Sequence, residues 1–280
     1  MIAPFRGEYG APRPDALRGV ALPPGPMPAR RGSRPLKRWR YVGVYGPDLM
    51  ICVGSVRIGP FRQEFWAVWD RGAGRLHERT RRGNRTVGLP EGRVRVRDGE
   101  VRIELELAEG PGVETVCPSG ASYAWTRKQG GIGATGTVDV GAGARYIDSR
   151  AVVDDTAGYH ARHTCWHWSA GVGVATDGRP VAWNLVEGVN DPATSSERTV
   201  WVDGVAEEPP PSDFAADLGR VDGLVFHQES VRERNENYGL LRSRYRQPFG
   251  TFAGRLPAAD GAGAELAEGY GVMERHDAFW

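Results

Sequence analysis

The chain has 280 residues, a formal net charge of +1, 40% hydrophobic residues and 25% charged residues. This composition excludes an intrinsically disordered chain, and the small net charge gives no general attraction to nucleic acid or to anionic lipid. The length suits two domains or one large all-β domain.

The compartment is predicted from what the sequence lacks. No apolar run approaches the roughly 20 residues that span a bilayer, so we expect no membrane insertion. Residues 1–40 contain no apolar segment of a secretory signal. The three cysteines, Cys52, Cys117 and Cys165, are odd in number and widely spaced, which argues against a disulfide framework. We therefore predict a cytoplasmic protein.

The first segment, residues 1–36, carries eight prolines. Proline lacks the amide proton and fixes φ, so this segment is predicted to be an extended arm and not the interior of a sheet. Its many arginines are interpreted as a solvated basic surface, because no recognition motif accompanies them. We expect no nucleic-acid partner.

Short β-rich runs bounded by turn residues follow the arm, which is typical of a sandwich or barrel. The predicted strands are 37–45, 49–58, 61–69, 93–97, 100–107, 114–117, 122–127, 136–140, 160–176, 179–189, 199–202, 223–231, 240–245, 251–255 and 268–276. One short helix is predicted over 213–218, with Ser212 as its N-cap and Gly219 as its stop.

The two halves of the chain resemble each other. The run Phe65–Trp69, followed by Arg85-Thr86-Val87, is similar to Val181–Asn184, followed by Arg198–Trp201, at an offset of about 115 residues. This indicates tandem β units over 37–140 and 141–280; chance similarity between β-rich segments is the alternative.

The hairpin around Asp177-Gly178 is the one whose faces can be assigned. With these two residues as the loop, Val172 opposes Trp183 and Trp168 opposes Glu187. Strand alternation then predicts one apolar, aromatic interior face with a carboxylate at its end. Its members are His160, Arg162, Thr164, Trp166, Trp168, Ala170, Val172, Val174, Val181, Trp183, Leu185 and Glu187.

A carboxylate among indoles loses hydration, so the pKa of Glu187 should rise unless Arg162 compensates its charge. The face is interpreted as a small-molecule pocket; a buried Arg162–Glu187 ion pair that only closes the barrel is the alternative. His163, Cys165 and His167 project to the opposite face, where we expect surface residues and no metal site.

Two further groups of acidic residues are candidates. Asp154 and Asp155 precede Tyr159 and His160, and capping a turn is the favoured role over an acid/base pair. The strand over 268–276 places Glu268, Tyr270, Val272, Glu274 and His276 on one face, interpreted as a final barrel strand with a polar rim.

Several long strings resemble the bacterial domain-of-unknown-function family 2804. They are Asp154–Trp168, Asp177–Leu185, Gln247–Phe252 and Glu268–Glu274, and the resemblance extends from about Pro23 onward. That family is distantly similar to the lipocalin-like group of carotenoid 1,2-hydratases and AttH-type proteins. The resemblance implies an all-β fold of two tandem lipocalin-like antiparallel β-barrels, or sandwich-like sheets, and chemistry on apolar molecules without a redox cofactor. It transfers no catalytic residue.

The leading hypothesis from the sequence is a protein that binds an apolar small molecule and catalyses a cofactor-independent hydration, cyclisation or isomerisation. Glu187 or Asp155 would supply the proton, and Arg162 and His160 would set its pKa. The predicted ligand-binding residues are Tyr159, Thr164, Trp166, Trp168 and Trp183. The alternatives are a non-catalytic carrier of a hydrophobic ligand and a structural or interaction protein with filled barrels.

Overall fold

The protein is almost entirely β-structure. The computed structural model describes residues 2–83, 85–237, 239 and 242–279. A single 3-10 turn, Asp15–Leu17, is the only helical element among them. The first sheet contains β1 (Phe5–Glu8), β4 (Lys37–Tyr45), β5 (Leu49–Ile58), β6 (Phe61–Asp70), β7 (Arg75–Arg82), β8 (Val87–Gly88), β9 (Arg93–Asp98), β10 (Val101–Leu107), β11 (Val113–Ser119), β12 (Ser122–Asp139) and β13 (Arg145–Gly158).

The second sheet contains β14 (His163–Ala175), β15 (Pro180–Glu187), β16 (Thr199–Val202), β17 (Val205–Glu207), β18 (Arg220–Val221), β19 (Leu224–Asn237), β20 (Arg242–Arg255) and β21 (Glu265–Phe279). A two-stranded ribbon joins β2 (Arg30–Arg31) to β3 (Arg34–Pro35). Most predicted strands are present, and β4, β5 and β16 have the predicted bounds.

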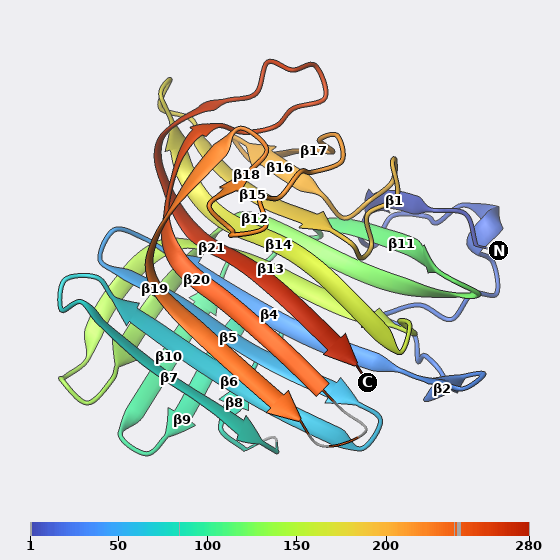
Figure 1. Cartoon of the computed structure of the whole chain (residues 1–280), viewed down its shortest axis with the longest axis horizontal. Coiled ribbons are helices and arrows are strands. Elements are labelled where there is room, and N and C mark those ends of the chain that lie inside the picture. Colours follow the sequence, from blue (N-terminus) through green and yellow to red (C-terminus); the bar gives the residue numbers. More distant parts are fainter. Residues whose placement is uncertain (1, 84, 238, 240–241, 280) are drawn as a thin grey trace.

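Both large sheets have a similar connectivity, although the first also carries β11, paired with β12, and β1, paired with β11. Their strand orders are β7-β6-β5-β4-β13-β12-β10-β9-β8 and β17-β16-β15-β14-β21-β20-β19-β18, all antiparallel. In each, the first strand of the unit pairs with its last, β4 with β13 and β14 with β21. The fold is therefore two curled antiparallel sheets of the predicted class, and Figure 1 shows the second lying across the first. The two segments that suggested the repeat, Phe65–Trp69 in β6 and Val181–Asn184 in β15, are not equivalent, however. Strand β6 lies two strands from β4, which pairs with the last strand of its unit, whereas β15 is the direct neighbour of β14, which occupies the equivalent position in the second unit.

The change from one sheet to the other falls between Gly158 and His163. The first sheet thus continues past residue 140, where the sequence placed the boundary between its units. The strand that carries it further, β13, was not predicted; Asp154 and Asp155 lie within it, so their expected turn role is wrong.

The helix predicted over 213–218 is also wrong. This segment is a turn whose backbone groups bond across the loop: the Asp222 amide donates to Asp213 O and the Ala215 amide donates to Arg220 O, both near 3 Å. The Asp222 carboxylate accepts the Asp213 amide as well, at 2.8 Å. These partners replace the i to i−4 bonds that a helix needs.

Four groups of buried side chains hold the molecule together. One lies inside the curl of each sheet, one lies between the two sheets, and one lies beneath the N-terminal arm. The N-terminal segment packs on the first sheet through β1, which pairs with β11, and through Leu17, Leu22 and Met27. Each such apolar side chain contributes about 1.5–3 kcal/mol by leaving water. Among the described residues, no helix is long and apolar enough to cross a membrane.

The β14–β15 hairpin has a register one residue away from the predicted one. Glu187 opposes His167, Val186 opposes Trp168 and Trp183 opposes Gly171. The strands end at Ala175 and Pro180, because the Ala175 amide donates to Arg179 O and makes the loop wider than Asp177-Gly178 alone. Since side chains alternate with period two, this slip moves all of β15 to the opposite face.

Candidate functional site

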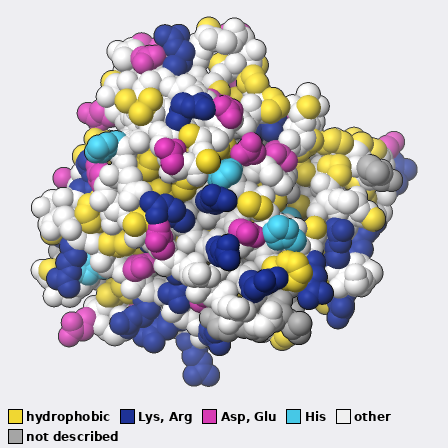
Figure 2. Space-filling model, in the orientation of Figure 1, with side chains coloured by type: hydrophobic (Ala, Val, Ile, Leu, Met, Phe, Trp, Pro, Cys, Tyr) yellow, Lys and Arg dark blue, Asp and Glu magenta, His cyan; other side chains and the backbone are white. Residues whose placement is uncertain are grey.

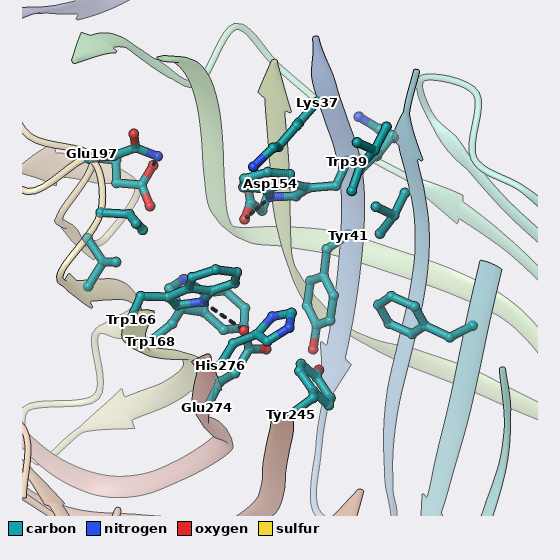
Figure 3. A pocket seen from close by; sticks show the side chains of 17 residues that line it. Lys37, Trp39, Tyr41, Asp154, Trp166, Trp168, Glu197, Tyr245, Glu274 and His276 are labelled. Atoms are coloured by element: carbon teal, nitrogen blue, oxygen red, sulfur yellow. Dashed lines mark hydrogen bonds between the residues drawn. The ribbon is translucent and has the colours of Figure 1, made fainter. Parts of the chain in front are cut away.

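A cavity of about 120 Å³ lies between the two sheets. Its first wall comes from the first sheet: Lys37, Trp39, Arg40, Tyr41, Val56, Ile58, Phe65 and Asp154. Its second wall comes from the second sheet and the loop after β15: Trp166, Trp168, Val186, Val189, Asn190, Glu197, Tyr245, Glu274 and His276. Figure 3 shows the labelled side chains, which come from β4, β13, β14, β20, β21 and the loop after β15, around one space. The site is thus an interface between sheets and not the interior of either curl.

Aromatic rings form most of the cavity surface. Trp39 and Trp166 stack across the interface with their centroids 6.5 Å apart and their planes inclined by 5°. The Tyr41 ring meets the Trp168 ring edge to face at 5.2 Å, and the Trp166 and His276 rings lie 4.4 Å apart. Such contacts fix the rings in one arrangement, so the cavity has a defined shape before any ligand enters.

Glu274 projects from β21 into this aromatic environment. Strand β21 pairs with β14 so that Glu274 opposes Trp168 and His276 opposes Trp166, which puts all four side chains on one face. The Trp166 indole donates to Glu274 Oε1 at 2.9 Å, drawn as the dashed line in Figure 3, and the Gln247 amide donates to Oε2 at 3.0 Å.

Burial raises the pKa of Glu274 to about 7, and the hydrogen bonds from Trp166 and Tyr245 offset only part of the lost hydration. A carboxyl group with this pKa is present in both protonation states near neutrality. It can therefore both give and receive a proton there.

A second polar group occupies another part of the cavity wall. The Lys128 ammonium from β12 lies 2.6 Å from Asp154 Oδ1 and 3.3 Å from Glu197 Oε1. The Trp39 indole donates to Asp154 Oδ2 at 3.4 Å, and the Asn190 amide donates to Glu197 Oε2 at 3.0 Å. Burial raises the pKa of Glu197, and the Lys128 ammonium opposes this rise. The cavity therefore borders a second buried carboxyl group beside Glu274.

The loop between β15 and β16 positions Asn190 and Glu197. Its backbone wraps around the fully buried Arg198, whose guanidinium donates to the carbonyl oxygens of Asp191, Pro192 and Ala193 at 3.0–3.3 Å. Arg6 from the N-terminal arm donates to Ser196 O at 2.8 Å. The arm thus helps to hold a wall of the cavity.

Two basic side chains in the wall have lowered pKa values. Burial lowers the pKa of His276 to about 3, so its ring is neutral, and Ser243 Oγ lies 2.8 Å from its Nε2. Burial lowers the pKa of Lys37 to about 7, and its ammonium donates to Ala161 O at 3.1 Å. Neither His276 nor Lys37 is therefore permanently charged at neutral pH.

A second cavity of about 100 Å³ adjoins the first. The two share Val56, Phe65, Tyr245 and His276 in their linings. The second extends toward the ends of β19 and β20, where its lining becomes polar.

The sequence matches the family described as domain of unknown function DUF2804 over residues 80–208 and 210–280. These segments cover more than half of the chain. The chain belongs to this family.

Solved structures share its fold. Kievitone hydratase from Nectria haematococca is similar with a TM-score of 0.51 at 10% identity, over 85% of this chain and 88% of that one. A protein described as an AttH from Nitrosomonas europaea matches with a TM-score of 0.43 at 11% identity, over 91% of this chain and 97% of that one. A search of curated proteins gave no match. The fold is therefore similar to that of kievitone hydratase, and the expected membership of the domain-of-unknown-function family 2804 is confirmed.

The predicted aromatic ligand-binding residues divide between two faces of the second sheet. In this family member Trp166 and Trp168 line the cavity. Trp183 is fully buried inside the curl of the second sheet, where it packs against Phe252 at 4.9 Å and donates to Ser169 Oγ. The register slip explains the separation.

Glu187 and Arg162 do not form the predicted pair. The Glu187 side chain is 44% exposed and accepts from His167 Nδ1 at 2.9 Å, on the face opposite Trp168. Arg162 is exposed, and its guanidinium lies over the Phe279 ring at 4.9 Å. The prediction that Glu187 lies on the indole face is therefore wrong.

The remaining predicted residues are not part of the cavity lining. Asp155 alternates to the other face of β13 and pairs with Arg40. His160 is buried and packs on Trp39 at 5.1 Å, and burial lowers its pKa to about 3. Thr164 is buried near the start of β14, and Tyr159 lies under the arm with its hydroxyl donating to Pro28 O at 2.7 Å.

Sequence reasoning missed the first-sheet wall and gave Glu274 no role at the site. The signal for Glu274 was present, because alternation along 268–276 already placed it on one face with His276. What was lacking was the pairing of this strand with β14, which joins residues about a hundred positions apart. No group of three or more His, Cys, Asp or Glu side chains able to hold a metal ion occurs among the described residues.

Proposed function

We propose that this protein binds a small, largely apolar molecule between its two sheets and that Glu274 gives it a proton. The reaction would be a hydration, cyclisation or isomerisation that uses no redox cofactor. The observation that carries the proposal is a carboxyl group with a pKa of about 7 inside an aromatic cavity. Aromatic walls suit an apolar ligand, and a few convergent polar groups are typical of small-molecule sites.

The chemistry follows from the surroundings of Glu274. Protonated Glu274 transfers its proton to an electron-rich carbon–carbon double bond, and the π electrons form the new C–H bond. The resulting cation lies against the faces of Trp39, Trp166 and Trp168, whose π electrons stabilise positive charge. Attack by water with loss of a proton completes a hydration, and loss of a neighbouring proton to the ionised Glu274 moves the double bond. Attack by a second double bond closes a ring and leaves a new cation, which loses a proton to the ionised Glu274.

A second carboxyl group supports the hydration variant. Glu197 borders the same cavity and is paired with Lys128, so its ionised form can accept the proton that the attacking water loses. Lys128 fixes Glu197 and Asp154 by ion pairs to both, so the acceptor oxygen is held in place. In the hydration, the alkene gains one proton from Glu274 and Glu197 gains the proton that the water loses, so the protons balance.

The size of the cavity favours a second candidate function. About 120 Å³ is below the range of roughly 300–1,000 Å³ that ligand pockets usually occupy. A protein whose two sheets simply pack together, with no ligand between them, would show such a space. In that case Glu274 and Tyr245 would be part of a structural hydrogen-bond network.

One experiment separates these functions. The purified protein is first analysed by native mass spectrometry for a co-purified ligand, and is then incubated with unsaturated terpenoids, polyenes and phenolic alkenes in water labelled with heavy oxygen. Products are separated by liquid chromatography, and their masses are measured by mass spectrometry. Hydration adds one labelled water to the mass, whereas cyclisation or isomerisation changes retention time at constant mass.

The decisive variant is Glu274→Gln, which keeps the shape of the side chain and removes its acidic proton. We expect conversion to fall by about 100-fold or more, as for loss of a general acid. Glu187→Gln is the matched control, since that carboxylate is exposed on the opposite face, and it should retain parental conversion. A folded Glu274→Gln protein that works at the parental rate overturns the proposal, and absence of any bound molecule or conversion supports the filled interface.

A further inference from the structure

The second cavity is lined by arginines. Arg232 and Arg234 come from β19 and Arg242 begins β20, while Glu236 is the one acidic side chain in the lining. Figure 2 shows Lys and Arg side chains gathered over the lower half of this face of the molecule. Positive charge in the cavity therefore exceeds negative charge.

Arg232 is held rigidly at the base of this cavity. Its side chain is almost fully buried, and its guanidinium lies over the Phe65 ring at 4.6 Å and the Tyr245 ring at 5.6 Å. Its Nε donates to Glu78 at 2.8 Å. A guanidinium fixed in this way stays charged, and the ion pair with Glu78 compensates part of its charge.

Two polar atoms of the lining have no hydrogen-bond partner among the described residues. They are Arg234 Nε, an N–H donor, and Thr80 Oγ1, a hydroxyl, and both atoms are shielded from solvent. Arg234 uses its Nη2 on Glu236 at 3.1 Å, which leaves Nε for another acceptor. Buried donors normally bind an acceptor, so an oxygen of a bound ligand could accept hydrogen bonds from these two atoms, although the rest of the Arg234 side chain is 39% exposed.

We propose that the second cavity binds the carboxylate of the ligand whose apolar part occupies the first cavity. The ligand would therefore be an amphipathic acid: its carboxylate oxygens accept from Arg234 Nε and Thr80 Oγ1, beside Arg232. Tyr245 and His276 line both cavities, so the path from the carboxylate to Glu274 runs past these two side chains. This inference rests on the proposed function and adds the class of substrate.

The test compares two probes that differ only in charge. Phenylbutyrate and phenylbutanamide have the same aromatic ring and chain, and their binding at neutral pH is followed by tryptophan fluorescence and calorimetry. We expect the acid to bind at least about tenfold more tightly, because hydrogen bonds between charged partners are the stronger ones. Arg234→Gln should reduce the affinity for the acid to that for the amide, and Thr80→Val should weaken the acid alone by a smaller factor.

Arg244→Gln is the matched control. Arg244 is an exposed arginine on the same strand pair, opposite Asn235 and one position away from the face that lines the cavity. It should bind the acid as the parent does. Equal binding of acid and amide overturns the carboxylate site and leaves the apolar pocket in place.

Two other results would separate this inference from the proposed function. Phenylbutyrate could bind with an affinity that depends on Arg234 but is unchanged in Trp166→Phe. In that case the carboxylate site is supported, and the proposal that the aromatic cavity binds the apolar part of the ligand is overturned. If neither probe binds the folded protein, both proposals are overturned.

Discussion

Replacing Glu274 by glutamine should change how the stability of the protein depends on pH. A glutamate carboxyl group in water has a pKa of about 4.5, and burial raises the pKa of Glu274 in the folded protein to about 7. Because the folded-state value is raised, the native state holds this proton more tightly than the unfolded chain does. Ionisation of Glu274 therefore costs nothing at pH values below the unfolded pKa, and its cost grows as pH rises toward the folded-state value.

The magnitude follows from that shift. At roughly 1.4 kcal/mol per pKa unit, the difference between 4.5 and about 7 lowers the free energy of unfolding of the parent by about 3.5 kcal/mol once Glu274 is fully ionised. Glutamine carries no proton to lose, so the variant escapes this cost. Between about pH 5 and about pH 8, the free energy of unfolding of Glu274→Gln should rise relative to that of the parent by roughly 2–3 kcal/mol.

The assay is urea denaturation of both proteins at the two pH values, followed by tryptophan fluorescence. Any constant cost of the new amide beside Gln247 is the same at both values and cancels in the comparison. The pH dependence of Glu197 cancels also, because both proteins carry it. Glu207→Gln, a substitution on the exposed strand β17, is the control and should show no such change.

A difference between parent and Glu274→Gln that stays the same at both pH values would refute this reasoning. It would mean that Glu274 is hydrated in the folded protein, and the proposed proton donor would lose its physical basis.

Two further predictions concern packing. Gly271→Ala should lower the free energy of unfolding by about 1–3 kcal/mol, because a Cβ there would lie 2.2 Å from Ala170 O. Gly110→Ala is the control, since no atom lies near its Cβ, and it should change the free energy of unfolding by less than about 0.5 kcal/mol. Equal urea midpoints for the two variants would contradict this prediction. A soluble disulfide reagent should modify the exposed Cys165 quickly and should modify Cys52 and Cys117 only after unfolding. Both of these thiols are buried, and burial raises the pKa of Cys117 to about 12. Rapid modification of all three cysteines in the native protein would contradict this prediction.

Local patterns in the sequence predicted the strands well and their partners poorly. Turn signals such as Gly59-Pro60 and Asp98-Gly99 delimit β5, β6, β9 and β10, because glycine supplies the positive φ that these turns require. Strand β13 escaped prediction, since Arg145–Gly158 mixes charged and apolar residues without a turn signal inside it. Its alternation is set by two neighbours, β4 and β12, that are distant in sequence.

The candidate site depended on a single register. A two-residue loop and a wider loop around Asp177-Gly178 both satisfy local turn chemistry, yet they send Glu187 to opposite faces. The physical idea of a carboxyl group desolvated among indoles applies to Glu274 instead. Long-range pairing of β14 with β21 decides which glutamate this is, and no local pattern reports it.

The position of β21 also has a consequence for how the molecule is made. This strand lies between β14 and β20, and its pairing with β14 joins residues 163–175 to residues 266–279. Closing a loop of that length delays folding, and during synthesis the N-terminal sheet emerges first. The aromatic wall of Trp39 and Tyr41 can therefore form while the chain is still being translated. The carboxyl group of Glu274 joins it only when the last strand docks.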